Sequence, residues 1–99
     1  MKKFLFSLFA SLALIPVFAT TYYSQGNVAF NTLGNWDTNR PGGGTGPANF
    51  TTSGDIFIIQ GLGGGGAANH AMSLGNTLSI GAGVKVQVES GGSLTCTSQ

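Results

Sequence analysis

Charged residues are scarce in this chain, which carries four lysines and arginines and three aspartates and glutamates in 99 residues. Two of the basic residues, Lys2 and Lys3, lie at the very start, so the remainder offers only Arg40 and Lys85. A protein that neutralises the phosphates of a nucleic acid needs a cluster of such residues. The composition therefore argues against a nucleic-acid partner.

Cysteine is nearly absent, since Cys96 stands alone and an intramolecular disulfide is excluded. A lone cysteine in an exported protein can pair between chains or hold a prosthetic group. Cys96, however, occupies an apolar position of the repeat described below. We therefore expect it to be buried as a small hydrophobic residue.

Histidine is equally rare, with His70 as its only instance. A catalytic histidine needs a nucleophile and an orienting acid nearby, and the sequence around His70 selects neither. We interpret His70 as a surface or turn residue. No catalytic residue, cofactor or metal ligand is assigned, and the protein is predicted not to be an enzyme.

Long apolar runs are absent except at the N-terminus, where residues 4–18 follow Lys2 and Lys3 and precede the small residue Ala19. A positive start, an apolar core and a small residue at the end are typical of a signal peptide cleaved after Ala19. A retained membrane anchor is the alternative. No later stretch is long and apolar enough to span a membrane, so we expect an extracellular or cell-surface protein.

Glycine, by contrast, is abundant, with 17 residues that all follow position 19. In the last quarter of the chain it marks an eight-residue repeat, with two full copies and a truncated third. Each copy opens with an apolar residue and carries a second one two positions later, which places both on one face of a strand. Glycine closes each full copy and allows a tight corner. The opening residues are Leu78, Val86 and Leu94, the second apolar residues are Ile80, Val88 and Cys96, and the closing glycines are Gly83 and Gly91.

A strand and corner repeated at a fixed period predict a solenoid, in which each strand buries its apolar face by stacking on the next. The predicted fold class is all-β, and specifically the start of a right-handed parallel β-helix. A small antiparallel meander has the same alternation and is the alternative. Residues 1–19 form the signal peptide, residues 20–54 an aromatic, asparagine-rich cap with a glycine- and proline-rich loop, and residues 55–99 the first strands of an incomplete solenoid.

Aromatic residues gather in segment 20–36, directly after the signal peptide. At the start of a solenoid, large aromatic side chains cover the open end of the first coil, which otherwise faces water. An aromatic platform for sugar rings is the functional alternative. Its candidate glycan contacts are Tyr22, Tyr23 and Trp36.

Segment 37–49 is predicted to be a loop, because its prolines and glycines exclude a regular element. Asp37 and Asn39 are oxygen donors two positions apart, as in many calcium loops, but further ligands are not evident. We interpret them as residues of a solvated turn, and whether a metal binds near Asp37 stays open. The next segment, Ile56–Ile59, is apolar and β-branched, which predicts a strand buried on both faces.

The glycines of segment 61–66 match the spacing of a dinucleotide-binding fingerprint. A true fingerprint opens a crossover helix, and segment 67–75 is too short for one. We therefore interpret this segment as a flexible loop, and expect no nucleotide cofactor.

Four stretches together carry a resemblance to a known class of proteins: Thr21–Gly26, Asn31–Asn39, Pro47–Gln60 and the eight-residue repeats. In this order they resemble the N-terminal region of large, adhesin-like surface proteins that Bacteroidota secrete through the type IX system. The resemblance covers most of residues 20–99. It implies β-helical or β-rich repeats after an aromatic start, and a sorting domain further along a longer chain.

The expected function is accordingly that of an exported, non-enzymatic, adhesin-like structural protein, of which these residues are an N-terminal fragment. Its stacked strands would display serine, threonine, asparagine and glutamine side chains to glycans or to other surface proteins. End-to-end self-association is a further expectation, because exposed terminal coils can stack. The alternative is the scaffold part of a β-helix enzyme or binding protein for carbohydrates.

Overall fold

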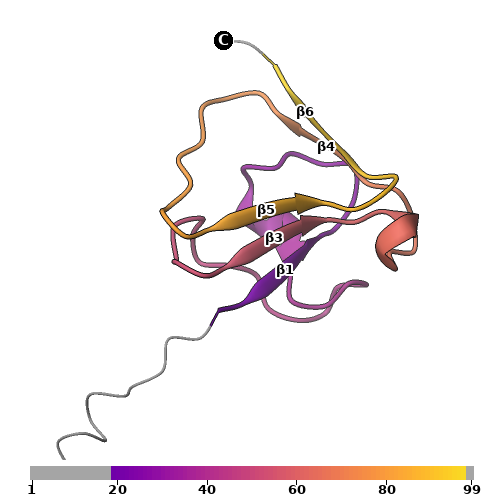
Figure 1. Cartoon of the computed structure of the whole chain (residues 1–99), viewed down its shortest axis with the longest axis horizontal. Coiled ribbons are helices and arrows are strands. Elements are labelled where there is room, and N and C mark those ends of the chain that lie inside the picture. Colours follow the sequence, from indigo (N-terminus) through magenta and orange to yellow (C-terminus); the bar gives the residue numbers. More distant parts are fainter. Residues whose placement is uncertain (1–18, 98–99) are drawn as a thin grey trace, which may run out of the picture.

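The computed structural model describes residues 19–97 (Figure 1). The predicted signal peptide therefore lies, apart from Ala19, outside the described residues. These residues form an all-β structure, as predicted, with six short strands and two single-turn 3-10 helices. No helix within residues 19–97 is long and apolar enough to cross a membrane. The elements are β1 (Thr21–Ser24), η1 (Leu33–Asn35), β2 (Trp36–Asp37), β3 (Ile56–Ile59), η2 (Leu62–Gly64), β4 (Ala71–Leu74), β5 (Lys85–Val88) and β6 (Ser93–Cys96).

The larger sheet has the order β2-β1-β3-β5 (Figure 1). Strands β1, β3 and β5 run parallel, so that Tyr22 pairs with Phe57 and Phe57 with Val86. Strand β2 runs antiparallel to β1 and covers its outer edge. The segment Ile56–Ile59 is thus one of the two inner strands, with Phe57 and Ile59 buried and the other two residues half-buried. The prediction of a strand here is confirmed, but the predicted burial on both faces is wrong, because the second face is only half-covered.

The smaller sheet contains β4 and β6, which are also parallel, with Met72 opposite Leu94. A single parallel bridge between Ala29 and Ser73 extends this arrangement to the other side of β4. Two hydrogen bonds support the bridge: the Phe30 N–H donates to Ser73 O at 2.8 Å, and the Ser73 N–H donates to Val28 O at 3.3 Å. Apart from the antiparallel β2, each sheet therefore adds its strands in the order of the sequence.

The hydrophobic core lies between the two sheets and is largely aromatic. Trp36 is 1% exposed, and its ring meets those of Phe30 and Phe57 edge to face, with centroids 5.0 and 5.1 Å apart. Edge-to-face packing at this distance is favourable because the ring edge and the ring face carry opposite partial charges. The buried hydrophobic residues are Phe30, Trp36, Phe50, Phe57, Ile59 and Met72.

Glycine forms the corners that precede β3 and β5. Gly54 and Gly83 have φ values of +92° and +83°, a region that residues with a Cβ rarely adopt. The Gly54 N–H donates to Gly83 O at 3.0 Å, so one corner lies directly on the other. The sequence-based assignment of Gly83 to a corner is confirmed.

The eight-residue repeats do not stack on one another, in contrast to the expectation from the sequence. The second copy supplies β5, which pairs with β3, and the third supplies β6, which pairs with β4. The first copy contains no strand, but its Gly81 N–H donates to Phe50 O at 3.1 Å. Because corners at Gly83 and Gly91 separate the copies, the three copies form three successive sides of one loop of chain, here called the three-sided turn 78–96. Stacking occurs only at larger offsets, 29 residues between Ile56 and Lys85 and 22 between Ala71 and Ser93.

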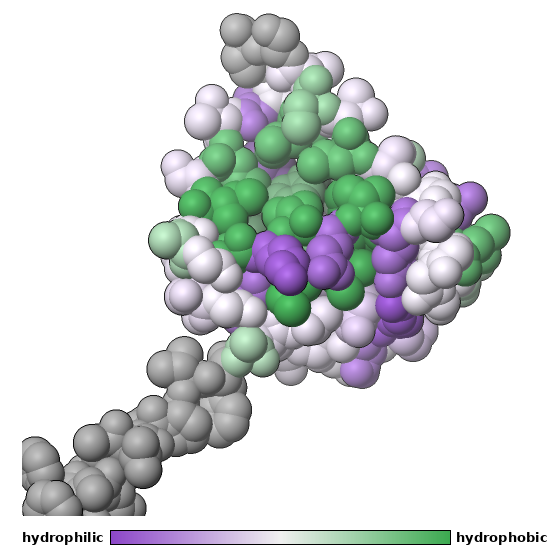
Figure 2. Space-filling view, viewed as in Figure 1, coloured by the Kyte–Doolittle hydropathy of each residue, from purple (hydrophilic) through white to green (hydrophobic). Residues whose placement is uncertain are grey.

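The burial expected for Cys96 is wrong, because its side chain is exposed. Val88 and Ile80, which share its apolar position in the repeat, are 47% and 42% exposed. Within the described residues, the three-sided turn 78–96 supplies an end strand to each sheet, and nothing there covers these side chains. Figure 2 shows the resulting apolar area, framed by segment 75–84, β5 and β6.

Candidate functional site

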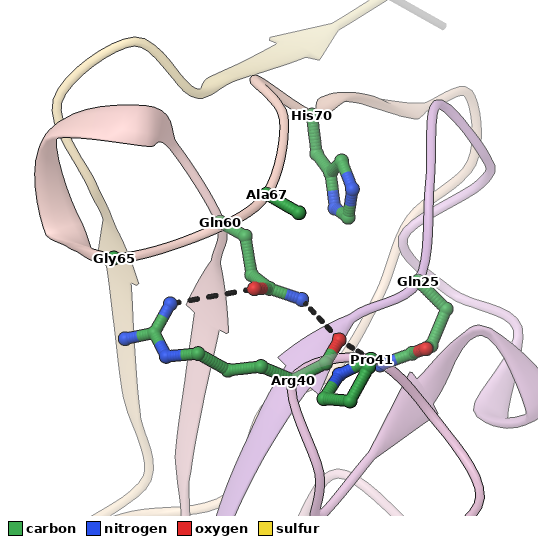
Figure 3. A pocket seen from close by; sticks show the side chains of 7 residues that line it. All are labelled: Gln25, Arg40, Pro41, Gln60, Gly65, Ala67 and His70. Atoms are coloured by element: carbon green, nitrogen blue, oxygen red, sulfur yellow. Dashed lines mark hydrogen bonds between the residues drawn. The ribbon is translucent and has the colours of Figure 1, made fainter.

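A pocket of about 340 Å³ lies where the loop after β2 meets the turn after β3 (Figure 3). This volume is at the small end of the range for ligand pockets in proteins. The pocket lies at the carboxyl ends of β1 and β3, since Gln25 and Gln60 directly follow these two strands. It is lined by Gln25, Arg40, Pro41, Gln60, Gly65, Ala67 and His70.

Arg40 lies across the ends of three stacked strands. Its guanidinium binds both carboxylate oxygens of Glu89, with Nη1–Oε1 at 2.9 Å and Nη2–Oε2 at 2.6 Å. Its carbonyl oxygen accepts hydrogen bonds from the side-chain amides of Gln25 at 3.3 Å and Gln60 at 2.8 Å. Gln25, Gln60 and Glu89 follow β1, β3 and β5, so one residue ties together the same corner in three successive layers.

The ion pair changes the acidity of both partners. Two hydrogen bonds from Arg40 lower the pKa of Glu89, partial burial opposes this effect, and the Gly61 N–H lowers the pKa further. The same hydrogen bonds raise the pKa of Arg40. Because the guanidinium charge is already paired, the pocket offers hydrogen-bond donors without a free positive charge. Such a site suits a neutral polar ligand better than a phosphate.

His70 contacts a buried hydroxyl behind the pocket. Its Nδ1 lies 2.8 Å from the Oγ of Ser24, which also accepts the Gln60 N–H at 2.9 Å. The remaining Ser24 proton suits donation to Nδ1, which leaves the Nε2–H of a neutral imidazole available to other partners. The prediction of His70 as a surface or turn residue thus holds only in part, since the residue is half-buried.

The pair of Ser24 and His70 does not form a hydrolytic triad in this arrangement. Ser24 is 0% exposed, so its hydroxyl is shielded from a substrate. The three carboxylates of the chain are engaged elsewhere: Asp37 accepts from the backbone N–H of its own loop, Asp55 from the Thr20 N–H, and Glu89 from Arg40. A triad needs a carboxylate that orients the histidine.

The candidate glycan contacts do not form one platform. Trp36 is buried, and its Nε1–H donates to Phe30 O at 2.8 Å, so its ring offers no face to a sugar. Tyr22 stacks on Phe57 with centroids 5.3 Å apart, on the inner face of β1. Tyr23 follows on the outer face, because side chains alternate along a strand, and the Arg40 guanidinium covers its ring at 4.5 Å.

The loop predicted for segment 37–49 is confirmed from residue 38 onwards. Asp37 itself belongs to β2, and its Oδ1 accepts hydrogen bonds from the Asn39 N–H at 2.8 Å and the Gly44 N–H at 2.9 Å. These bonds hold the loop in place. Within residues 19–97, no group of three or more histidine, cysteine and acidic side chains is positioned for a metal ion.

The sequence analysis missed the residues of the pocket, apart from His70 as a weighed candidate. Arg40 and Glu89 are 49 positions apart, and Ser24 and His70 are 46 apart. One signal was present, since a long polar residue follows each of β1, β3 and β5. It becomes visible only once the pairing of these strands is known.

Comparisons of the chain with models of protein families, with curated proteins and with solved structures returned no match.

Proposed function

We propose that this chain is the N-terminal part of an exported, adhesin-like structural protein at the cell surface or outside the cell, without catalytic activity of its own. In this proposal, residues 20–54 cap a right-handed parallel β-helix of which residues 55–97 form the first layers. Glycans or other surface proteins are its proposed partners.

The observation that carries the proposal is the register of the strands. Strands β1, β3 and β5 pair in parallel along one side, and Ala29, β4 and β6 do so along another. A β-helix is built in this way, because each strand pairs with the strand one turn of chain further on. The antiparallel β2 supports the capping role, since it occupies the edge of β1 that would otherwise be open.

The proposed mechanism is the display of side chains on a rigid side surface. On the smaller sheet, Ser73, Ser93 and Thr95 are exposed, and Ser73 pairs with Thr95 across the two strands. Rows of hydroxyl groups on successive layers offer many weak hydrogen bonds to a polar polymer. Linked weak contacts give high overall avidity when many layers take part.

Intact mass spectrometry and cell fractionation of the native host test this proposal. We expect to find the protein outside the cytoplasm. We also expect its first residue to be Thr20, because residues 1–19 are removed on export. A mass larger than that of residues 20–99 would mean that further layers follow, and binding to glycans or surface proteins would then be sought in those layers. A cytoplasmic protein that retains residues 1–19 would contradict the proposal.

The pocket beside Arg40 and His70 favours a second candidate, a carbohydrate-binding or carbohydrate-active β-helix. Its amide, imidazole and guanidinium groups match the hydroxyls of a sugar. Titration with neutral and acidic oligosaccharides, followed by NMR, tests for binding through shifts of the His70 ring signals. Release of reducing ends from polysaccharides tests for catalysis, and our first proposal expects none.

A further inference from the structure

We propose that removal of the signal peptide creates an ion pair within the fold, between the new α-ammonium group of Thr20 and the buried carboxylate of Asp55. The uncleaved chain cannot form this pair, because its Thr20 nitrogen belongs to a neutral amide. This inference rests on the cleavage after Ala19 that the proposed function includes, and it adds a structural consequence of that cleavage.

Asp55 is a buried acidic residue without a cationic side chain beside it. It is 4% exposed and directly precedes β3, in a turn in which its N–H donates to Thr52 O at 3.1 Å. The part of the chain that the structure describes contains one ion pair, between Arg40 and Glu89, so no side chain there balances the Asp55 charge. Lys85 donates its main-chain N–H to Asp55 O at 2.9 Å, but its side chain is exposed. A buried carboxylate without a positive partner is costly, because it has lost the water that stabilises its charge.

The main-chain nitrogen of Thr20 contacts this carboxylate. It donates a hydrogen bond to Asp55 Oδ1 at 3.1 Å, while Thr20 O accepts the Ile56 N–H at 2.9 Å. Thr20 directly precedes β1, and Thr21 pairs with Ile56 in the parallel arrangement of β1 and β3 (Figure 1). The position of the nitrogen is therefore held by residues that remain in the chain after cleavage.

Hydrolysis of the bond between Ala19 and Thr20 changes the charge of this nitrogen. The C–N bond breaks, and the oxygen of one water molecule joins the carbonyl carbon of Ala19, which leaves as a carboxylate with residues 1–19. Both protons of the water end on the Thr20 nitrogen, which is then an α-ammonium group near neutral pH. The hydrogen bond to Asp55 thereby becomes one between opposite charges, and such bonds are about twice as strong as neutral ones.

The new charge lies where water reaches it, so the cost of burying it is small. Ala19 is exposed and Thr20 is half-buried. Ala19 lies against the corner at Gly54, since a Cβ added there would come within 3.3 Å of the Ala19 Cβ. Loss of Ala19 opens space beside the ammonium group, whose other protons can bind water. The carboxylate is buried before cleavage as well, so cleavage adds an attraction without further burial of Asp55.

The position of the cleaved bond also sets the order of events. Main-chain groups that are hydrogen-bonded in a folded protein are poor targets for a protease, and Thr20 is bonded to both Asp55 and Ile56. Cleavage therefore precedes folding. The chain that is being exported lacks the ion pair and is less stable, which favours the unfolded state until the signal peptide has been removed.

Three forms of the mature chain, made by chemical synthesis, test the ion pair. The first begins with the free amine of Thr20, the second carries an acetyl group on that amine, and the third begins with the free amine of Ala19. Acetylation restores a neutral amide, and the additional Ala19 keeps the charge but moves it one residue away from Asp55. Urea unfolding should give both of these forms an unfolding constant at least about tenfold larger than that of the first form.

Asp55→Asn shows whether the effect of acetylation depends on the carboxylate. In this background, acetylation of Thr20 should change the unfolding constant by less than about twofold, because the partner charge is gone. The reactivity of the amine gives a second measurement that needs no variant. A nearby carboxylate favours the ammonium form, which is not a nucleophile, so the Thr20 amine should react with acetic anhydride more slowly in the folded chain than in urea. The exposed Lys85 amine is the internal control and should react similarly in both.

Each result decides between the inference and the proposed function. Equal stability of the free and acetylated Thr20 forms, or equal reactivity of the Thr20 amine in the folded and unfolded chain, would overturn the inference and leave the proposed export untouched. So would an exported native chain that begins at another residue. A cytoplasmic chain that retains residues 1–19 would contradict the proposed function as well.

Discussion

Arg40 and Glu89 form an ion pair with two hydrogen bonds, and this pair joins the loop after β2 to the corner after β5. Their side chains are 30% and 13% exposed, so the contact is better shielded from water than most surface ion pairs. Glu89 also accepts the Gly61 N–H at 3.1 Å, which adds the corner after β3 to the same cluster. One carboxylate thus links three segments that are distant in the sequence.

Replacement of Glu89 by glutamine should destabilise the fold by about 1–2 kcal/mol, because it removes a charge from two hydrogen bonds while it keeps the shape of the side chain. Urea unfolding at a fixed protein concentration measures the loss. Asn76→Ser, at an exposed turn, is the control and should change the free energy of unfolding by less than about 0.5 kcal/mol. Equal stability of Glu89→Gln and the parent would show that the charge of the ion pair contributes nothing to the corner.

Acid should weaken the fold by protonating Glu89. The pKa of Glu89 is lowered from its ordinary value of 4.5, so the folded state binds this proton less readily than the unfolded state does. The stability from Glu89 is therefore complete above the ordinary value and is lost as the pH falls through the lower pKa of the folded state. Urea midpoints measured across this window should fall in the parent and vary less in Glu89→Gln. Parallel curves for the two proteins would contradict this assignment.

Gly81→Ala tests the first side of the three-sided turn 78–96. A Cβ at Gly81 would overlap the main chain of Thr51, which cannot move aside easily. We expect a loss of about 1–3 kcal/mol, the usual range for an overfilled interior. Gly34→Ala is the matched control, because a Cβ there meets nothing within 4 Å. Thermal unfolding compares the two variants. If Gly81→Ala is as stable as Gly34→Ala, the first side of the three-sided turn 78–96 does not pack against Thr51.

The sequence predicted the local elements better than their partners. The apolar run Ile56–Ile59 is a strand, and the corner at Gly83 is where the repeat placed it. The alternation of side chains defines which face of a strand is apolar, but it does not say which strand lies beside it. Corners of different lengths separate the partners, so that Thr21 pairs with Ile56, 35 residues further on. The period of eight therefore corresponds to the length of one side of the three-sided turn 78–96. It does not correspond to the offset in sequence between stacked strands, which is what the repeat had been expected to give.

The prediction that Cys96 is buried was wrong for a related reason. The repeat put it in one column with Ile80 and Val88, whereas the structure pairs it with Leu74 across β4 and β6. Burial, however, requires a further layer on top, and the sequence of a repeat does not show which copy is the last. The pocket was missed because its contacts cross the layers, and no local pattern joins Ser24 to His70.

Ser24→Ala should destabilise the protein although it removes a single oxygen atom. Ser24 is fully buried, and its Oγ is the acceptor for the Gln60 N–H and a partner of His70 Nδ1. Removal of the hydroxyl leaves a buried N–H without this acceptor, which costs about 1–3 kcal/mol. It also releases the His70 ring, whose ¹⁵N signals should shift as the Nδ1 contact is lost. Ser79→Ala, at an exposed position, is the control and should change neither the urea midpoint nor the ring signals. A stable Ser24→Ala with unchanged His70 signals would mean that the hydroxyl holds neither group, and the pocket would then owe its shape to Arg40 and Gln60 alone.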